Sequence, residues 1–139
     1  MGLNRTNSDD QAIPVIYDTD IVEARAAARS LASRVGFTET DLVLIASAVS
    51  EIARNIVEYT KGGEVILSVI HNHSRLGLQV IARDQGPGIR DLSLAMKDGY
   101  STSRSLGLGL PGSRRLMDEF RVESALASGT TVTMRKWLS

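Results

Sequence analysis

The sequence contains no cysteine, which excludes disulfide bonds, thiolate metal sites and a thiol nucleophile and suits a reducing compartment. It lacks an apolar run long enough to span a bilayer, and its polar first residues, MGLNRTNSDDQ, have no signal-peptide core. An excess of charge is also missing, because 16 basic and 16 acidic side chains give a formal net charge of zero. No overall electric field therefore favours nucleic acid or anionic lipid. We expect a cytoplasmic protein with no nucleic acid and no membrane among its partners.

The length and composition are those of one folded domain. The chain has 139 residues, of which 42% are hydrophobic, and a mean hydropathy of -0.04. A chain of this size can bury one core without disulfide or metal cross-links. The polar segment 1–12 is expected to be a flexible N-terminus, so the predicted domain covers residues 13–139.

The first half of the chain predicts one short strand and two helices. Residues 14–18 have the pattern of a strand, and the proline at its start favours an edge position. A capping-box pattern at Asp20 predicts the start of a helix, and Gly36 is placed to end it. A second capping pattern begins at Thr38 and predicts a longer helix that runs to about Tyr59.

Beyond this helix the spacing of hydrophobic residues changes to that of strands. The predicted order is strands 64–71 and 76–83, a long segment 85–108 rich in glycine and serine, a helix 110–119, and strands 120–126 and 130–137. Helices and strands are mixed without regular alternation. This order predicts an α+β fold, a two-layer sandwich of about three helices on one face of a mixed, largely antiparallel sheet.

Glu51 and Asn55 lie one turn apart, late in the second predicted helix. The hydrophobic residues of that helix define a core-facing stripe, and at about 100° per residue Asn55 falls at its edge. A carboxylate beside an amide oxygen at the rim of a cleft can hold a water or hydroxyl and a hard cation. The alternative is that both residues are solvated surface, as such residues mostly are.

Two glycine-rich segments and one hairpin turn are further candidates. The segment Asp84–Ile89 follows a predicted strand, where an aspartate can accept hydrogen bonds from an amino group and Gly86 and Gly88 let a backbone approach a flat ligand. The alternative is an ordinary turn. The segment Gly107–Gly112 lies at the start of a predicted helix, where exposed N–H groups can bind phosphate, but it is not a P-loop. The pair Gly129-Thr130 has the pattern of a hairpin turn.

The order of these motifs is more specific than any one of them. Glu-x-x-x-Asn on a long helix, Asp-x-Gly-x-Gly after a pair of strands and Gly-x-Gly before a helix resemble the N, G1 and G2 boxes of the GHKL ATPase/kinase superfamily. The resemblance covers nearly the whole chain and implies the Bergerat ATP-binding fold, with an ATP lid at about 85–108. The length is similar to that of bacterial serine/threonine switch kinases of the anti-sigma group.

The resemblance implies a role for each motif residue. Asn55 would bind Mg²⁺, and Glu51 would be the general base or the carboxylate that orients the attacking group. Asp84 would accept a hydrogen bond from the adenine amino group. Gly86 and Gly88 would make room for the ring, and Gly107 and Gly109 would let the lid wrap the phosphates of ATP. Thr130 would help to bind the adenine end.

The function implied by the resemblance is a Mg-ATP-dependent serine/threonine protein kinase. Its expected substrates are STAS-domain antagonist and scaffold proteins, and its expected target is a PP2C-type phosphatase that it activates in bacterial stress signalling. The alternative is an anti-sigma factor that sequesters a sigma factor, with kinase activity secondary. A nucleotide-binding fold without turnover is the third possibility.

Overall fold

The computed structural model describes residues 10–84, 116–125 and 129–138. Within these residues the chain forms five strands and two helices. They are β1 (Gln11–Val15), α1 (Asp18–Val35), α2 (Glu39–Tyr59), β2 (Gly63–Asn72), β3 (Arg75–Asp84), β4 (Glu119–Ala125) and β5 (Gly129–Trp137).

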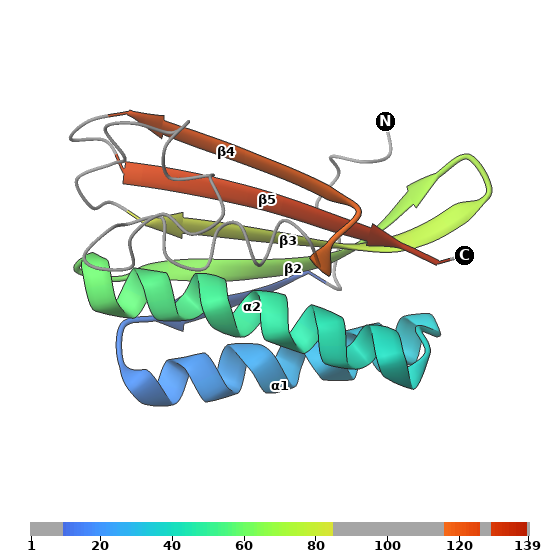
Figure 1. The fold of residues 1–139 in the computed structure, drawn as a ribbon, viewed down its shortest axis with the longest axis horizontal. Helices are drawn as coiled ribbons and strands as arrows, with labels where there is room; N and C mark the ends of the chain where they lie inside the picture. The colour runs from blue at the N-terminus through green and yellow to red at the C-terminus, as the bar shows by residue number, and fades with distance from the viewer. Residues whose placement is uncertain (1–9, 85–115, 126–128, 139) are drawn as a thin grey trace.

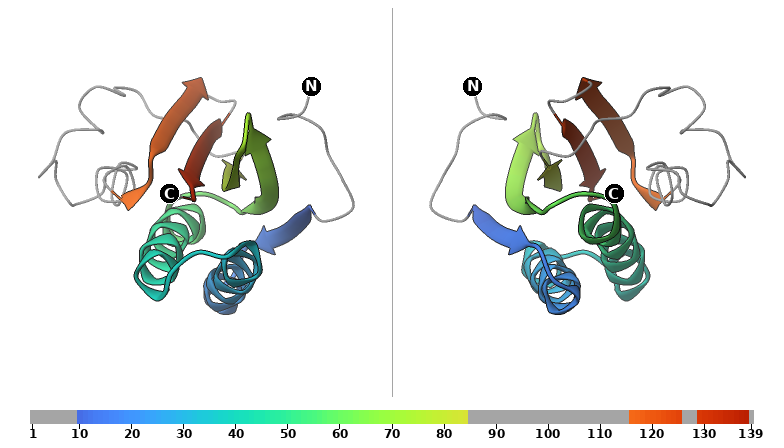
Figure 2. Two further views of the ribbon diagram at one scale, coloured as in Figure 1. Left: turned by 90° about the vertical axis from the view of Figure 1, so that its right-hand side faces the viewer. Right: turned by 90° about the vertical axis from the view of Figure 1, so that its left-hand side faces the viewer.

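The five strands form one sheet in the order β1-β2-β3-β5-β4, and every pair of neighbours is antiparallel. Both helices lie on the same face of this sheet (Figures 1 and 2). The predicted α+β sandwich on a largely antiparallel sheet is therefore confirmed. Most of the predicted helix 110–119 and all of the segment 85–108 lie outside the described residues, so the structure describes two of the three expected helices. Neither of these is long and apolar enough to cross a membrane.

The start of the chain differs from the prediction. The first strand is Gln11–Val15, not 14–18, and so it begins inside the segment expected to be flexible. Pairing of this strand with β2 explains the difference. The strand includes the polar residue Gln11 because Gln11 pairs with Leu67 of β2. The edge position is confirmed, since the described residues pair β1 with β2 alone.

The first helix begins two residues before Asp20, which was predicted to be its cap. Asp20 lies instead in the first turn, where its carboxylate accepts hydrogen bonds from the backbone N–H of Ile16 and Tyr17 at 2.8 and 2.9 Å. The N–H of Tyr17, and then that of Ile16, hold the pKa of Asp20 below its ordinary value. The predicted C-cap is confirmed, because Gly36 has φ 115°.

The second helix and the first hairpin follow the sequence more closely. Thr38 caps α2 by accepting a hydrogen bond from the N–H of Asp41 at 3.2 Å, and the helix ends at Tyr59 as predicted. Strands β2 and β3 each extend one residue further at both ends than predicted. The connection expected to be four residues long is therefore a two-residue turn, with His73 at φ 59°.

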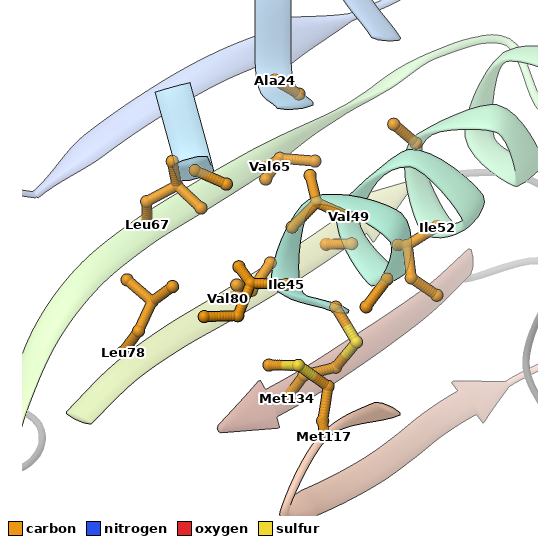
Figure 3. Packing of buried hydrophobic residues seen from close by; sticks show 14 of the residues in the cluster. Ala24, Ile45, Val49, Ile52, Val65, Leu67, Leu78, Val80, Met117 and Met134 are labelled. Carbon is orange, nitrogen blue, oxygen red and sulfur yellow. The ribbon is translucent and has the colours of Figure 1, made fainter. Parts of the chain in front are cut away.

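The core lies between the two helices and the sheet face that they cover. Figure 3 shows side chains from α2 packed against β2, β3 and β5, with Met117 at one side. Alternate residues of β3 reach this core, since Leu78, Val80 and Ala82 are buried. The same alternation determines on which face of the sheet the last residue of each strand lies. The largest fully buried side chains are Ile45, Leu67, Leu78, Met134, Val15, Val49, Val65 and Val80.

Candidate functional site

Glu51 and Asn55 lie on α2 beside its buried stripe, as the sequence predicted. Asn55 is half-buried, and its neighbours in the stripe, Ile52 and Ile56, are 2% and 3% exposed. Glu51 is more open, with 46% of its side chain exposed and one carboxylate oxygen 3.5 Å from Nη1 of Arg54. The amide therefore lies at the rim of the core, and the carboxylate lies further out, where another molecule can reach it.

Asp84 is the last residue of β3. The alternation along this strand places it on the same face as the buried residues Val80 and Ala82, which is the face that the helices cover. Across the ladder Asp84 lies opposite Gly63, the first residue of β2. Its carboxyl group therefore stands where the helix-covered face of the sheet reaches its end.

Thr130 lies beside Asp84 on the neighbouring strand. Arg83 pairs with Thr131, so the next step of the same antiparallel register brings Thr130 next to Asp84. Thr130 is 8% exposed, and its hydroxyl is 3.0 Å from that of Ser124 on β4. Sequence analysis missed Ser124; the register of the last hairpin was the signal that could have found it.

These residues come together at one end of the molecule. Figure 1 shows that the last turn of α2, the end of β3 and the start of β5 lie at the same end, on the left. Asn55, Asp84 and Thr130 thus share one region, with Glu51 one turn further back on α2. The other predicted site residues lie outside the described part of the chain; they are Gly86, Gly88, Gly107 and Gly109.

A cavity of about 900 Å³ lies at this end, but mostly on the opposite face of the sheet. Among its described lining residues Asp84 alone belongs to the predicted site. Most strand residues that line the cavity are the sequence neighbours of buried core residues, so their side chains point to the opposite side. The cavity therefore lies mostly on the face of the sheet away from the helices. The described residues that line it are Ala12, Pro14, Ile16, Lys61, Gly62, Gly63, Glu64, Arg83, Asp84 and Thr131.

The metal-binding capacity of the described residues is limited. No group of three or more histidine or carboxylate side chains in residues 10–84, 116–125 and 129–138 could hold a metal ion. A single amide oxygen such as that of Asn55 is compatible with Mg²⁺, which often keeps several waters and takes its remaining ligands from substrate phosphates. The residues present therefore fit a magnesium ion that arrives with a nucleotide.

Comparison with known proteins defines the class to which this fold and site belong. The sequence profile of the histidine kinase-like ATPase domain matches residues 17–136, and the chain belongs to this family. Its relatives include the serine/threonine-protein kinase RsbT of Bacillus subtilis, which is 43% identical over 131 residues, or 94% of this chain and 98% of RsbT. The anti-sigma F factor of Priestia megaterium is 31% identical, and the match covers 84% of this chain and 83% of that protein.

The solved structures support the same fold. The SiaB-SiaC complex from Pseudomonas aeruginosa contains a chain that matches 92% of this one with a TM-score of 0.55 and 12% identity. At that identity the likeness concerns the fold alone. The family match and the relatives confirm the predicted membership of the GHKL superfamily and the class of enzyme, an ATP-dependent kinase of the RsbT type.

Proposed function

We propose that this chain is a Mg-ATP-dependent kinase that phosphorylates a serine or threonine of a STAS-domain protein. In this proposal it is a cytoplasmic component of partner switching in bacterial stress signalling, with antagonist and scaffold proteins of the STAS type as substrates and a PP2C-type phosphatase as the target that it activates. The observation that supports it best is that the elements carrying Asn55, Asp84 and Thr130, namely the C-terminal part of α2, the end of β3 and the start of β5, lie at one end of the molecule, within the residues that match the family.

The nucleotide would bind between this end of the sheet and α2. Asp84 would accept a hydrogen bond from the adenine amino group, since a carboxylate is purely an acceptor. Thr130, whose hydroxyl Ser124 orients, would support the same end of the base. Asn55 would provide an amide oxygen to Mg²⁺ from the edge of α2.

The glycine motifs complete the proposed nucleotide site. Gly86 and Gly88 would leave space for the adenine ring, because a residue without a Cβ lets the backbone approach a flat ligand closely. Gly107 and Gly109 would allow the segment 85–108 to wrap the phosphates as a lid. These four assignments are based on the resemblance of the motifs.

Glu51 would act on the hydroxyl of the protein substrate. Its carboxylate is 46% exposed, so a serine or threonine presented by another protein can approach it. When bound, Mg-ATP supplies the phosphoryl group and neutralises charge that develops during transfer. The chain's own contribution is then to position the nucleotide and to orient or accept the proton of the hydroxyl at Glu51.

The test is transfer of label from γ-labelled ATP with Mg²⁺ to a purified STAS-domain protein. We expect the wild-type chain to label a serine or threonine of that protein and Glu51→Gln to lose most of the activity. Glu23→Gln, which changes an exposed glutamate on α1, is the matched control and should keep full activity. Full activity of Glu51→Gln would contradict the role of Glu51, and no labelling by the wild type would contradict the kinase function.

A second function is favoured by the anti-sigma F factor relatives. In this case the chain would hold a sigma factor and release it when a rival partner binds, and phosphoryl transfer would be secondary. Co-purification from a bacterial lysate separates the two functions. Recovery of an RNA-polymerase sigma factor would support the anti-sigma role, whereas recovery of a PP2C-type phosphatase would support the kinase and activator role.

A further inference from the structure

Gly63 lies against the backbone of β3 at the point where that strand ends. It pairs with Asp84 across the β2–β3 ladder. A Cβ atom added to Gly63 would stand 2.0 Å from the carbonyl oxygen of Arg83 and 3.0 Å from the Cα of Asp84. Both neighbours are backbone atoms, so no side-chain rotation can make room. The absence of a side chain at Gly63 is therefore a condition for the observed position of Asp84.

The contacts around Gly63 direct a clash toward the end of β3, whose pairing with β5 extends as far as Arg83 and Thr131. On its other side Gly63 pairs with Val15, which is fully buried and resists displacement. One step further into the ladder, Glu64 and Arg83 form an ion pair at 2.8 Å. A side chain at Gly63 would therefore push on Asp84, the terminal residue of its strand.

The turn before Gly63 also links the start of β2 to α2, the helix that carries Asn55. The hydroxyl of Thr60 donates a hydrogen bond to the carbonyl oxygen of Ile56 at 2.7 Å and accepts one from the N–H of Gly62 at 2.9 Å. Gly62 itself has φ 128°, a conformation that favours glycine. The end of α2 and the start of β2 are thus held together within a few residues.

We propose that Gly63 is a positioning residue that sets the place of the Asp84 carboxylate and thereby the preference of the site for adenine. This inference rests on the proposed function, in which Asp84 accepts a hydrogen bond from the adenine amino group. Guanine presents a carbonyl oxygen at the corresponding position, which a carboxylate cannot bind. If Asp84 were displaced, the site would lose the hydrogen bond that favours adenine over guanine, while its contacts to the phosphates would remain.

The hairpin contains a matched control at its other end. A Cβ atom added to Gly77 would stand 2.6 Å from Cε3 of Trp137 and 2.8 Å from the carbonyl oxygen of Lys136. Gly77 pairs with Ile70, seven residues along the ladder from Gly63, or about 23 Å at the rise of a strand. Gly77→Ala therefore also introduces a clash closer than 3.0 Å into this hairpin, but far from Asp84.

The experiment measures the dissociation constants of Mg-ATP and Mg-GTP by calorimetry, together with stability to urea. We expect Gly63→Ala to reduce the ratio of ATP to GTP affinity about tenfold or more, the effect of losing a hydrogen bond to a charged group. Gly77→Ala should lower stability and leave the ratio within about twofold of the wild type. A wild-type ratio in folded Gly63→Ala would overturn the inference.

Two further variants keep the test decisive. Arg83→Ala removes the ion pair beside Gly63 and should lower the ratio about two- to fivefold, as for an exposed ion pair. Arg121→Ala, which removes an exposed ion pair with Glu123 on β4, should leave the ratio of ATP to GTP affinity unchanged. If Gly63→Ala does not fold, an unchanged ratio in Arg83→Ala overturns the inference.

Failure of the proposed function gives a different result. If the wild type does not bind Mg-ATP, or if Asp84→Asn keeps the wild-type preference for adenine, then the proposed nucleotide site is wrong and the inference falls with it. If Asp84→Asn loses the preference but Gly63→Ala and Arg83→Ala keep it, the role of Gly63 alone is overturned.

Discussion

Both ends of the β2–β3 hairpin contain a glycine whose missing side chain lets two parts of the chain meet. At one end Gly63 touches the backbone of Arg83, beside the carboxylate of Asp84. At the other end Gly77 lies under the indole ring of Trp137. The first contact is between backbone segments at the edge of the proposed site, whereas the second is between a strand and a large side chain.

The Gly77 end is held by a polar and aromatic network. The indole N–H of Trp137 donates a hydrogen bond to the carboxylate of Glu119 at 2.7 Å, and the guanidinium of Arg75 lies 4.8 Å from the centre of the indole. Trp137 is 6% exposed, so this end contributes buried surface and fixes the last strand. One end of the hairpin thus holds the last strand through a buried aromatic side chain, whereas the other lies beside Asp84, the carboxylate that we propose binds adenine.

The largest effect is expected from Asn55→Ala in the proposed nucleotide site. Loss of the proposed Mg²⁺ ligand should lower phosphoryl transfer about 100-fold or more, because a bound metal ion supplies several kcal/mol of charge stabilisation. Stability to urea should change little, since Asn55 is only half-buried. The control is Asn72→Ala, at the far end of β2, which should keep its activity. Equal activities of Asn55→Ala and Asn72→Ala would contradict the proposed role of Asn55 as a magnesium ligand.

A change at the other end should affect stability instead. Trp137→Ala should lower the free energy of unfolding by about 3–5 kcal/mol, as for a large aromatic side chain removed from a buried position. Urea unfolding measures this loss, and Trp137→Phe should show a smaller one. In either folded variant the ratio of ATP to GTP affinity should equal that of the wild type; a lower ratio would show that the two ends are coupled.

A smaller effect is expected where Thr130 meets Ser124. Thr130→Val removes one side of the 3.0 Å hydroxyl contact and should lower the free energy of unfolding by about 0.5–1.5 kcal/mol, the net contribution of a typical hydrogen bond, since Ser124 keeps its hydrogen bond to the carbonyl oxygen of Gly129. It should also weaken Mg-ATP binding, whereas Ser124→Ala should act mainly on stability. A double-mutant cycle measures the coupling, and additive losses would contradict the contact.

The smallest effect is expected at the start of α1. The pKa of Asp20 is lowered from 3.8 by the backbone N–H of Tyr17 and Ile16, so its ionised form stabilises the fold. That contribution is present above pH 3.8 and is lost as the pH falls through the lowered pKa. Asp20→Ala should therefore be less stable than wild type at neutral pH, with a difference that shrinks in acid. Asp18→Ala controls for charge alone, and a difference independent of pH would contradict this prediction.

The sequence predicted the parts of the fold that local patterns determine. The length of α2 follows from Thr38 at its start and from its hydrophobic spacing, and the position of Asn55 at the edge of the buried stripe follows from the same period. The predicted start of α1 was wrong because the sequence pattern at Asp20 fits either a helix cap or a residue of the first turn. Hydrogen bonds to Ile16 and Tyr17 determine which of the two it is.

Features that depend on contacts between distant segments could not be predicted. Gly63 lies against Arg83 and Asp84 only because β3 returns to pair with β2. The contact of Ser124 with Thr130 is more local and depends on the register of the short β4–β5 hairpin. A pair of glycines after a helix, such as Gly62 and Gly63, resembles any other turn in sequence. Asp84 is a candidate because it belongs to a motif, whereas Gly63, which lies against the backbone at the end of its strand, belongs to none.

The measurement that tests the central claim most directly is a titration of nitrogen-labelled protein with Mg-ATP, followed by the NMR signals of the backbone amides. We expect large shifts for Asn55, Gly63, Asp84 and Thr130 at one end of the molecule and small shifts for Gly77 and Trp137 at the other. Shifts concentrated around Gly77 and Trp137, or no shifts at saturating Mg-ATP, would contradict it.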